Sequence, residues 1–332
     1  MKHPGIVIGG VVGTVVATLI IAVFLYSFPT YSSTREEPIK IGISEWAGYD
    51  PIFIAEKKGF FEKNGVNVKL VFDREYVPSQ QRYLDGEVDG VFVSIADVIY
   101  ATAGGRSTKL VLISDYSTTG DVLVSKLDSI SDLKNKIIGV DGFGTFSHML
   151  VLKILESNGI TEKDVKFLIV PAQDAVKMLD EGKVQASHTW GATKSEALQK
   201  GYKILASAEP FPYLITDGLV FSSKIIEERP DDIQKIVKSF FEGQEFFKSN
   251  PDEAIRIMAE GEGVDTNTIK LGLDGIHMVE LAENKKLMDV NNDGTLDNAI
   301  KVDSEFFVRF GQIGYTPNLE DLIEPRFVTS IT

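Results

Sequence analysis

The sequence of 332 residues contains no cysteine, and this absence excludes several kinds of chemistry at once. A chain without thiols forms no disulfide, holds no zinc or iron centre through thiolates, and offers neither a cysteine nucleophile nor an N-terminal cysteine for lipid attachment. Positive charge is also scarce, because 34 Lys and Arg stand against 48 Asp and Glu, which gives a net charge of −14. This balance argues against a nucleic-acid-binding surface, which requires clustered cations to neutralise phosphates.

The N-terminal region lacks charged residues from Pro4 to Thr34, and residues 6–26 are almost entirely apolar. As a helix this run would be about 31 Å long, enough for the roughly 30 Å hydrocarbon core of a bilayer. We predict that residues 1–30 form a retained membrane anchor or a cleaved signal segment, and that residues 31–38 form a tether. The anchor is favoured because the run exceeds a usual signal core and SFPTYSST offers no clear cleavage site. The remainder would lie on the outer face of the membrane if anchored, or be secreted or periplasmic if cleaved.

From residue 39 onward, short apolar runs alternate with amphipathic patterns, which predicts an α/β fold. Hydrophobic residues make up 43% of the chain and charged residues 25%, as in folded proteins, and the length suits about two domains. Strands are predicted at 40–43, 66–72, 90–93, 109–114, 122–125, 136–140, 165–169 and 219–221, with a further short one at 185–187. Helices are predicted between them, and His277 is expected in a later helix.

Four predicted strands run directly into helix starts, and these junctions carry aromatic residues. The aromatics are Trp46, Tyr49, Phe143, Phe146 and Trp190. In open α/β sheets, ligands bind beyond the carboxyl ends of strands, where helix N-termini offer unpaired N–H groups. We therefore predict a ligand cleft at these junctions from their shared placement, although each aromatic taken alone is better explained as a core residue.

Several segments resemble one protein family and follow its order along the chain. They include GISEWAGYDPIFIAEKKGFFEKNGVNVKLVF (42–72), LDGEVDGVFVSIADVIYATAGG (84–105), GVDGFGTFSHMLVLKILESNGI (139–160), and the stretches 170–198 and 306–323. This pattern resembles the ABC-transporter substrate-binding proteins of the nitrate/sulfonate/taurine/thiamine-precursor group. The resemblance implies a two-lobed periplasmic-binding-protein type II fold, with lobe one at 38–121 plus 218–332 and lobe two at 122–217. It also implies a monomeric receptor that closes on its solute and docks on a membrane permease.

The resemblance further implies which residues contact the solute. They are Glu45, Trp46, Tyr49, Ser94, Asp97, Phe143, Gly144, Thr145, Phe146, His148, His188, Trp190 and Asp217. Aromatic walls favour an organic solute, and the start of a helix at Thr145 suits an anionic head. Glu45, Asp97 and Asp217 could instead pair with an amine, so a taurine-like zwitterion and an amino-pyrimidine both remain open. No arginine falls in these loops, which weakens a purely sulfonate interpretation, while Asp97 and Asp217 could equally serve as caps or hinge contacts.

One further motif, DVNNDGTLD at 289–297, matches the first nine positions of an EF-hand-type calcium loop. It predicts a structural calcium site from Asp289, Asn291, Asp293, Thr295 and Asp297. The twelfth position is Ile300 instead of the bidentate Glu, so an ordinary acidic turn is the alternative. No other cofactor is expected.

These observations favour a solute receptor of an ABC importer that binds a sulfonate-like or pyrimidine-like molecule, with no enzymatic activity and no nucleic-acid partner. One alternative is a surface binding or adhesion module with a calcium loop. A second is an enzyme on the same fold, similar to the thiamine-pyrimidine synthases. Those relatives use a cysteine-rich iron motif, from which a chain without cysteine departs.

Overall fold

Six strands form the first sheet of the computed structural model, which describes Met1, residues 37–290 and residues 294–332. The strands are β1 (Ile39–Ser44), β2 (Val68–Asp73), β3 (Gly90–Ser94), β4 (Thr108–Ser117), β10 (Thr216–Ser222) and β11 (Ile276–Met278). Their order is β11-β4-β10-β3-β1-β2. β1 pairs in parallel with β2 and β3, whereas β10 runs antiparallel to both of its neighbours. The central strands are buried along almost their whole length, as expected when helices cover both faces.

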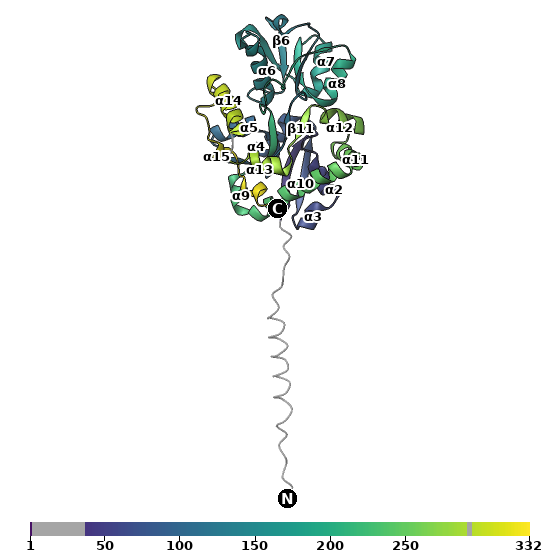
Figure 1. Cartoon of the computed structure of the whole chain (residues 1–332), viewed down its shortest axis with the longest axis vertical. Coiled ribbons are helices and arrows are strands. Elements are labelled where there is room, and N and C mark those ends of the chain that lie inside the picture. Colours follow the sequence, from purple (N-terminus) through teal and green to yellow (C-terminus); the bar gives the residue numbers. More distant parts are fainter. Residues whose placement is uncertain (2–36, 291–293) are drawn as a thin grey trace. The chain divides into compact units, whose positions relative to one another are not determined.

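Five strands form the second sheet, in the order β7-β6-β8-β5-β9. They are β5 (Val122–Ser125), β6 (Ile137–Val140), β7 (Lys166–Ile169), β8 (Ala186–Thr189) and β9 (Lys203–Ser207). Helices α6 (Phe146–Ser157), α7 (Ala175–Asp180) and α8 (Gly191–Gln199) pack against this sheet (Figure 1). The predicted α/β class is therefore confirmed, with two separate sheets.

The remaining helices accompany the first sheet. They are α2 (Pro51–Lys57), α3 (Phe60–Asn64), α4 (Tyr76–Leu84), α5 (Ile95–Ala103), α9 (Ser223–Glu228), α10 (Pro230–Ser249), α11 (Pro251–Glu262), α12 (Thr266–Leu273), α13 (Leu281–Leu287), α14 (Thr295–Arg309), α15 (Leu319–Leu322) and α16 (Arg326–Thr329). The sequence explains α10 well, because a proline occupies its first turn and Ile233, Ile236, Val237 and Phe240 form one buried stripe. The ring of Phe240 lies 5.8 Å from that of Phe92 on β3, which ties α10 to the sheet.

The chain passes between the two sheets twice. It leaves the first sheet after Ser117 and enters the second at Val122, and it returns between Ser207 and Thr216. We keep the division into lobe one (38–121 plus 218–332) and lobe two (122–217) as a proposal. The strand assignments place Thr216 and Asp217 in β10 of the first sheet, two residues before the boundary expected from the sequence.

A single carbonyl group accepts hydrogen bonds from the first crossing between the sheets, residues 118–121. The backbone N–H groups of Thr118, Thr119 and Gly120 all donate to the oxygen of Gly275, at 2.8, 3.1 and 2.9 Å. Gly275 has a φ of +92°, and a Cβ atom there would lie 2.4 Å from the nitrogen of Gly120. The close approach therefore requires glycine at this position.

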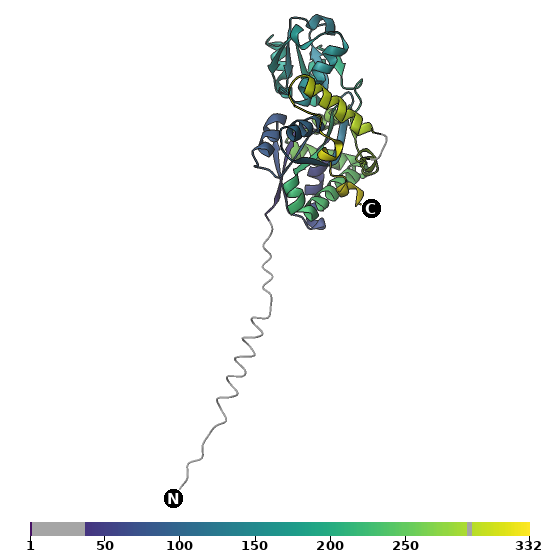
Figure 2. The same ribbon diagram turned by 90° about the vertical axis from the view of Figure 1, so that its left-hand side faces the viewer.

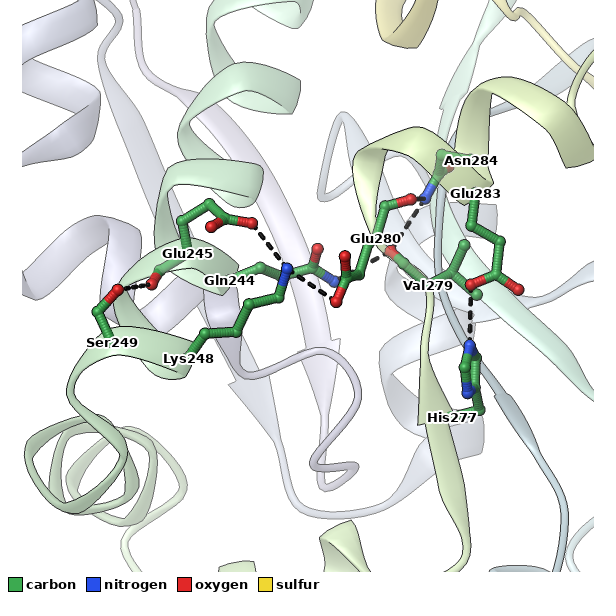
Figure 3. Close-up of polar contacts among 9 residues, drawn as sticks. All are labelled: Gln244, Glu245, Lys248, Ser249, His277, Val279, Glu280, Glu283 and Asn284. Atoms are coloured by element: carbon green, nitrogen blue, oxygen red, sulfur yellow. Dashed lines mark hydrogen bonds and ion pairs between the residues drawn. The ribbon is translucent and has the colours of Figure 1, made fainter.

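The segment that follows Gly275 is held against α10 and β4. The amide groups of Gln244 and Asn284 both donate to the oxygen of Val279, while His277 Nε2 and Glu283 Oε2 lie 2.8 Å apart (Figure 3). Asn284 also accepts a hydrogen bond from the N–H of Ile113 on β4. The expectation that His277 lies in a helix is wrong, because it pairs with β4 as part of the three-residue strand β11.

Helix α14 contacts both lobes (Figure 2). It packs on α5 of lobe one, and Arg309 at its C-terminal end lies 2.6 Å from the carboxylate of Glu156 on α6 of lobe two. The expected anchor at 1–30 and most of the tether at 31–38 lie outside the described residues. Within the part of the chain that the structure describes, no helix is long and apolar enough to cross a membrane.

Candidate functional site

Both lobes and both crossings contribute to one small cavity. Its lining consists of Glu45, Trp46, Tyr49, Tyr76, Asp121, Phe146, Trp190, Ile215 and Asp217. These residues follow β1, begin α4 and α6, precede α8, or lie on or beside the two crossings. The cavity retains a free volume of ≈ 10 Å³, which is about the space that one water molecule or one ammonium group needs.

The walls of the cavity are aromatic and meet across the two lobes. The ring of Trp46 lies 6.1 Å from that of Trp190 in an edge-on arrangement, and the ring of Tyr76 lies 5.0 Å from that of Phe146, also edge-on. Within lobe two, Phe146 and Trp190 are 6.0 Å apart. Such pairs combine apolar contact with favourable ring electrostatics, so they stabilise the contact between the two lobes as well as enclosing the cavity.

Three of the lining side chains direct their polar hydrogen atoms at aspartates. Trp46 Nε1 donates to Asp115 Oδ1 at 2.9 Å, and the hydroxyl of Tyr49 donates to Asp217 Oδ1 at 3.0 Å. The hydroxyl of Tyr76 donates to a third carboxylate, described below. These bonds fix the aromatic rings and leave their donors engaged.

The aspartate bonded to Tyr76 is Asp97, near the N-terminus of α5. The preceding Ser94 caps this helix by accepting from the N–H of Ala96, and its own N–H donates to the oxygen of Tyr76. Ser94 and Asp97 therefore lie behind Tyr76 and orient it, and they are outside the cavity lining.

A buried histidine supports the carboxylate of the first crossing. His188 Nε2 lies 2.9 Å from Asp121 Oδ1, and both side chains are fully buried. Because a carboxylate accepts, Nε2 is the nitrogen that carries hydrogen in this pair. The second oxygen, Asp121 Oδ2, has no hydrogen-bond partner among the described residues. Asp121 thus presents one satisfied and one unsatisfied oxygen.

Burial raises the pKa of the carboxyl groups around the cavity. It raises the pKa of Asp97 to about 7, against hydrogen bonds from Tyr76 and Gln80 that lower it. Burial likewise raises the pKa of Asp115 to about 7, and it raises the pKa of Asp217 well above its ordinary value, with the charges of Asp115 and Asp121 acting in the same direction. Several acids therefore share one poorly solvated region, where their negative charges repel one another.

A second acidic pair lies next to Trp46. Burial raises the pKa of Glu262 to about 8 and that of Asp50 well above its ordinary value. The guanidinium of Arg74 lies 3.3 Å from Glu45, but its side chain is 73% exposed, so this pair is partly screened by solvent.

Six residues expected at the site line the cavity: Glu45, Trp46, Tyr49, Phe146, Trp190 and Asp217. His188 lies directly behind it, with its ring 5.5 Å from that of Trp190. Their proximity supports the expected cleft, and their contact with a solute remains a prediction.

The other expected residues of lobe two lie beside the cavity instead of in its lining. Phe143 is 56% exposed and Gly144 forms a turn with a φ of +75°. The hydroxyl of Thr145 donates to the oxygen of Gly142 at 2.8 Å, so it is already engaged. His148 is buried against Phe167, and burial lowers its pKa to about 4.

Sequence reasoning did not select Tyr76, Asp121 or Ile215 as contacts. Tyr76 begins the helix after β2, so the rule that selected the other strand-to-helix junctions would also have found it. Asp121 is the last residue of the first segment expected for lobe one (38–121), and nothing in its local sequence indicates an unpaired oxygen. Ile215 is an ordinary apolar residue whose position depends on the return crossing.

The expected calcium loop is only partly described. Asn291 and Asp293 lie outside the described residues, and Asp297 pairs with Lys301 one helical turn later. Among the described residues, no group of three or more His, Cys, Asp or Glu side chains is arranged to hold a metal ion. The calcium site, which depends on Asp289 and Thr295 as well, stays a prediction.

Comparison with known proteins identifies the family. The model of the NMT1/THI5-like family matches residues 46–254. The chain belongs to this family. The resemblance derived from the sequence segments is thereby confirmed.

Relatives of the chain are named as binding proteins. One of Brucella abortus (strain 2308), provisionally named a binding protein, is 23% identical over 303 residues, covering 89% of this chain and 92% of the relative. Another relative, from Bacillus subtilis (strain 168) and provisionally named an aliphatic sulfonates-binding protein, is 27% identical over 241 residues. The match covers 70% of this chain and 72% of the relative. The crystal structure of the periplasmic aliphatic sulphonate binding protein SsuA from Escherichia coli matches with a TM-score of 0.69 at 18% identity. The match covers 89% of this chain and 99% of SsuA.

The same fold also occurs in an enzyme. The desulfurization enzyme DszB matches with a TM-score of 0.65 at 13% identity, covering 89% of this chain and 98% of the enzyme. The periplasmic-binding-protein fold is therefore established for this chain, whereas the fold alone does not separate binding from catalysis.

Proposed function

We propose that this protein is an extracytoplasmic receptor that traps a small organic solute between its two lobes and delivers it to the permease of an ABC importer. The observation that carries the proposal is the aromatic cavity to which both lobes and both crossings contribute. A site divided in this way forms completely only when the lobes approach, so solute binding and closure stabilise each other.

The relatives support this role, because their printed names describe binding proteins, including proteins for sulfonates. The proposed location outside the cytoplasm depends on the apolar N-terminal run of residues 6–26, which would hold the receptor near its permease. The comparisons give no support to the alternative role as an adhesion module.

The test is a thermal-shift screen of the full-length chain against small organic solutes, followed by calorimetry. A solute present at 100 times its Kd stabilises the native state by about 2.7 kcal/mol, which shifts the melting temperature by several degrees. We expect one chemical class of solute to do so and to be recovered unchanged by mass spectrometry. Conversion of the solute would instead indicate an enzyme.

Two matched variants locate the binding site. Trp46→Ala removes one wall and should weaken binding by about 1–3 kcal/mol, roughly tenfold to a hundredfold. Because Trp46 is buried and bonded to Asp115, the melting temperature of the ligand-free variant is measured first to verify that it folds. Phe143→Ala removes an exposed aromatic outside the cavity and should leave affinity unchanged. Equal losses in both variants, or no binding by any solute, would refute the proposed site.

A further inference from the structure

We propose that the solute carries a positively charged head with N–H groups, and that Asp121 and Asp217 are its counter-ions inside the aromatic cavity. This inference rests on the proposed function and specifies the chemical class of solute. It concerns the sign of charge that the cavity accepts, which neither the family nor the fold determines.

The first argument is the unsatisfied oxygen of Asp121. The side chain is fully buried and lines the cavity, and His188 engages only Oδ1. A buried acceptor without a partner costs about 1–3 kcal/mol, and more when it is charged. A donor arriving with the solute removes this cost, and an N–H group supplies one.

The second argument is that several side-chain donors of the cavity are already committed. The indole N–H of Trp46 donates to Asp115, the hydroxyl of Tyr49 donates to Asp217, and the hydroxyl of Tyr76 donates to Asp97. No Lys or Arg occurs among the lining residues, all of which the structure describes. An anionic head would therefore face three carboxylates, of which Glu45 pairs with the largely exposed Arg74, in a region where water screens the repulsion poorly.

The third argument is the character of the walls. The rings of Trp46 and Trp190 meet edge-on, and both line a cavity whose free volume of ≈ 10 Å³ has room for about one ammonium group. A cation near such rings is stabilised by about 0.5–2 kcal/mol through the ring quadrupole. Burial is the main cause of the raised pKa of Asp217, and the negative charges of Asp115 and Asp121 add to it, so a bound cation would relieve part of this repulsion.

The main competing outcome is an anion held by the N-terminus of a helix. Helix α8 begins at Gly191, directly after Trp190, and its first N–H groups could serve a sulfonate. The observations favour the cation, because the lining carboxylates Glu45, Asp121 and Asp217 lie in the same small cavity.

The experiment compares compounds that share one aromatic body and differ in their heads. Benzylamine, benzyltrimethylammonium, benzyl alcohol and benzenesulfonate are added to the full-length chain at pH 8, and melting temperature and calorimetric Kd are measured. We expect benzylamine to bind most tightly and benzenesulfonate to cause no shift. Benzyltrimethylammonium should bind at least about tenfold more weakly than benzylamine, because it has no hydrogen to donate to Asp121 Oδ2.

Variants connect the effect to the two aspartates. Asp121→Asn and Asp217→Asn should each weaken benzylamine binding at least tenfold. Asp303→Asn is the matched control, because Asp303 on α14 is equally buried with both oxygens unpartnered among the described residues, yet lies outside the cavity lining. Its affinity for benzylamine should equal that of the wild type. The melting temperature without ligand verifies that each variant folds, and having two aspartate variants keeps the test decisive if one does not.

The outcomes separate the two proposals. Binding of benzenesulfonate in preference to benzylamine, with loss in Trp46→Ala, overturns the cationic solute and leaves the receptor function standing. Equal binding of benzylamine and benzyltrimethylammonium, or full affinity in both aspartate variants, overturns the role assigned to the carboxylates. If none of the four compounds binds but another anionic or neutral solute does, the cationic class is again wrong. Absence of binding by every solute in the wider screen counts against both proposals.

Discussion

Replacement of Asp97 by asparagine should change how the stability of the ligand-free protein depends on pH. Asp97 is buried behind Tyr76, and its pKa is raised from 3.8 to about 7 chiefly by burial. A raised native pKa means that the native state binds more protons than the unfolded state between about pH 4 and pH 7. Stability is therefore lost as the pH rises through this window.

The magnitude follows from the two pKa values. Between pH 5 and pH 8 the unfolded carboxyl is ionised throughout, whereas the native carboxyl gives up its proton, so one such group lowers the free energy of unfolding by about 2–3 kcal/mol. This corresponds to a fall of roughly 5 °C in melting temperature for a domain of this size. In Asp97→Asn the melting temperature should fall less between pH 5 and pH 8, by this same amount. The amide oxygen still accepts the hydrogen bond from Tyr76 but carries no charge to be created as the pH rises.

The comparison must be made between variants, because other groups act in the opposite direction. The pKa of His148 is lowered to about 4, so its contribution to stability is lost as the pH falls below its ordinary value. Urea unfolding at pH 5, 6, 7 and 8 for the wild type and Asp97→Asn isolates the aspartate, and Asp85→Asn at the exposed end of α4 controls for the loss of one surface charge. Parallel pH profiles for wild type and Asp97→Asn would refute the assignment.

Three further predictions concern the crossing, the core and the cavity. Gly275→Ala should destabilise the protein by about 1–3 kcal/mol in urea unfolding, because the added Cβ would meet Gly120. Gly65→Ala, also at positive φ but with open space around it, should cost less. Equal losses of stability would contradict the close approach of Gly275 to the first crossing. Phe240→Ala should cost about 3–5 kcal/mol in the same assay, since the side chain is fully buried, and a loss below 1 kcal/mol would contradict its place in the core. Benzylamine binding should release protons, because a bound cation lowers the pKa of Asp217. The affinity should therefore rise with pH, and the calorimetric binding enthalpy should vary with the ionisation enthalpy of the buffer. Identical binding enthalpies in phosphate and Tris would contradict this prediction.

The arrangement of strands and helices was largely predictable because local patterns determine it. Apolar runs such as 90–93 and 122–125 correspond to β3 and β5, and the helices expected between strands include α2, whose first position is a proline. The strand predictions are wrong or missing where tertiary contacts, and not the local pattern, determine whether a strand forms. β11 has only three residues and exists because it pairs with the end of β4, so the residues around His277 carry no strand pattern of their own. No strand is predicted at β9 (Lys203–Ser207) for a similar reason, since it forms an edge of the second sheet through its pairing with β5.

The aromatic walls of the cavity were predictable and its charge was not, and the difference has a physical cause. Trp46, Phe146 and Trp190 follow strands at sheet-to-helix junctions, a position that the chain order reveals. The ligand preference depends instead on how the donors and acceptors are paired, and pairing is a property of the folded structure. Asp121 could be a satisfied structural residue if both oxygens were bonded, and it becomes a counter-ion candidate because His188 reaches only one of them. Two relatives could therefore share every junction and the same fold yet differ in solute preference, because a single aspartate oxygen that is bonded in one protein and unpaired in the other changes the free energy of binding a donor by about 1–3 kcal/mol.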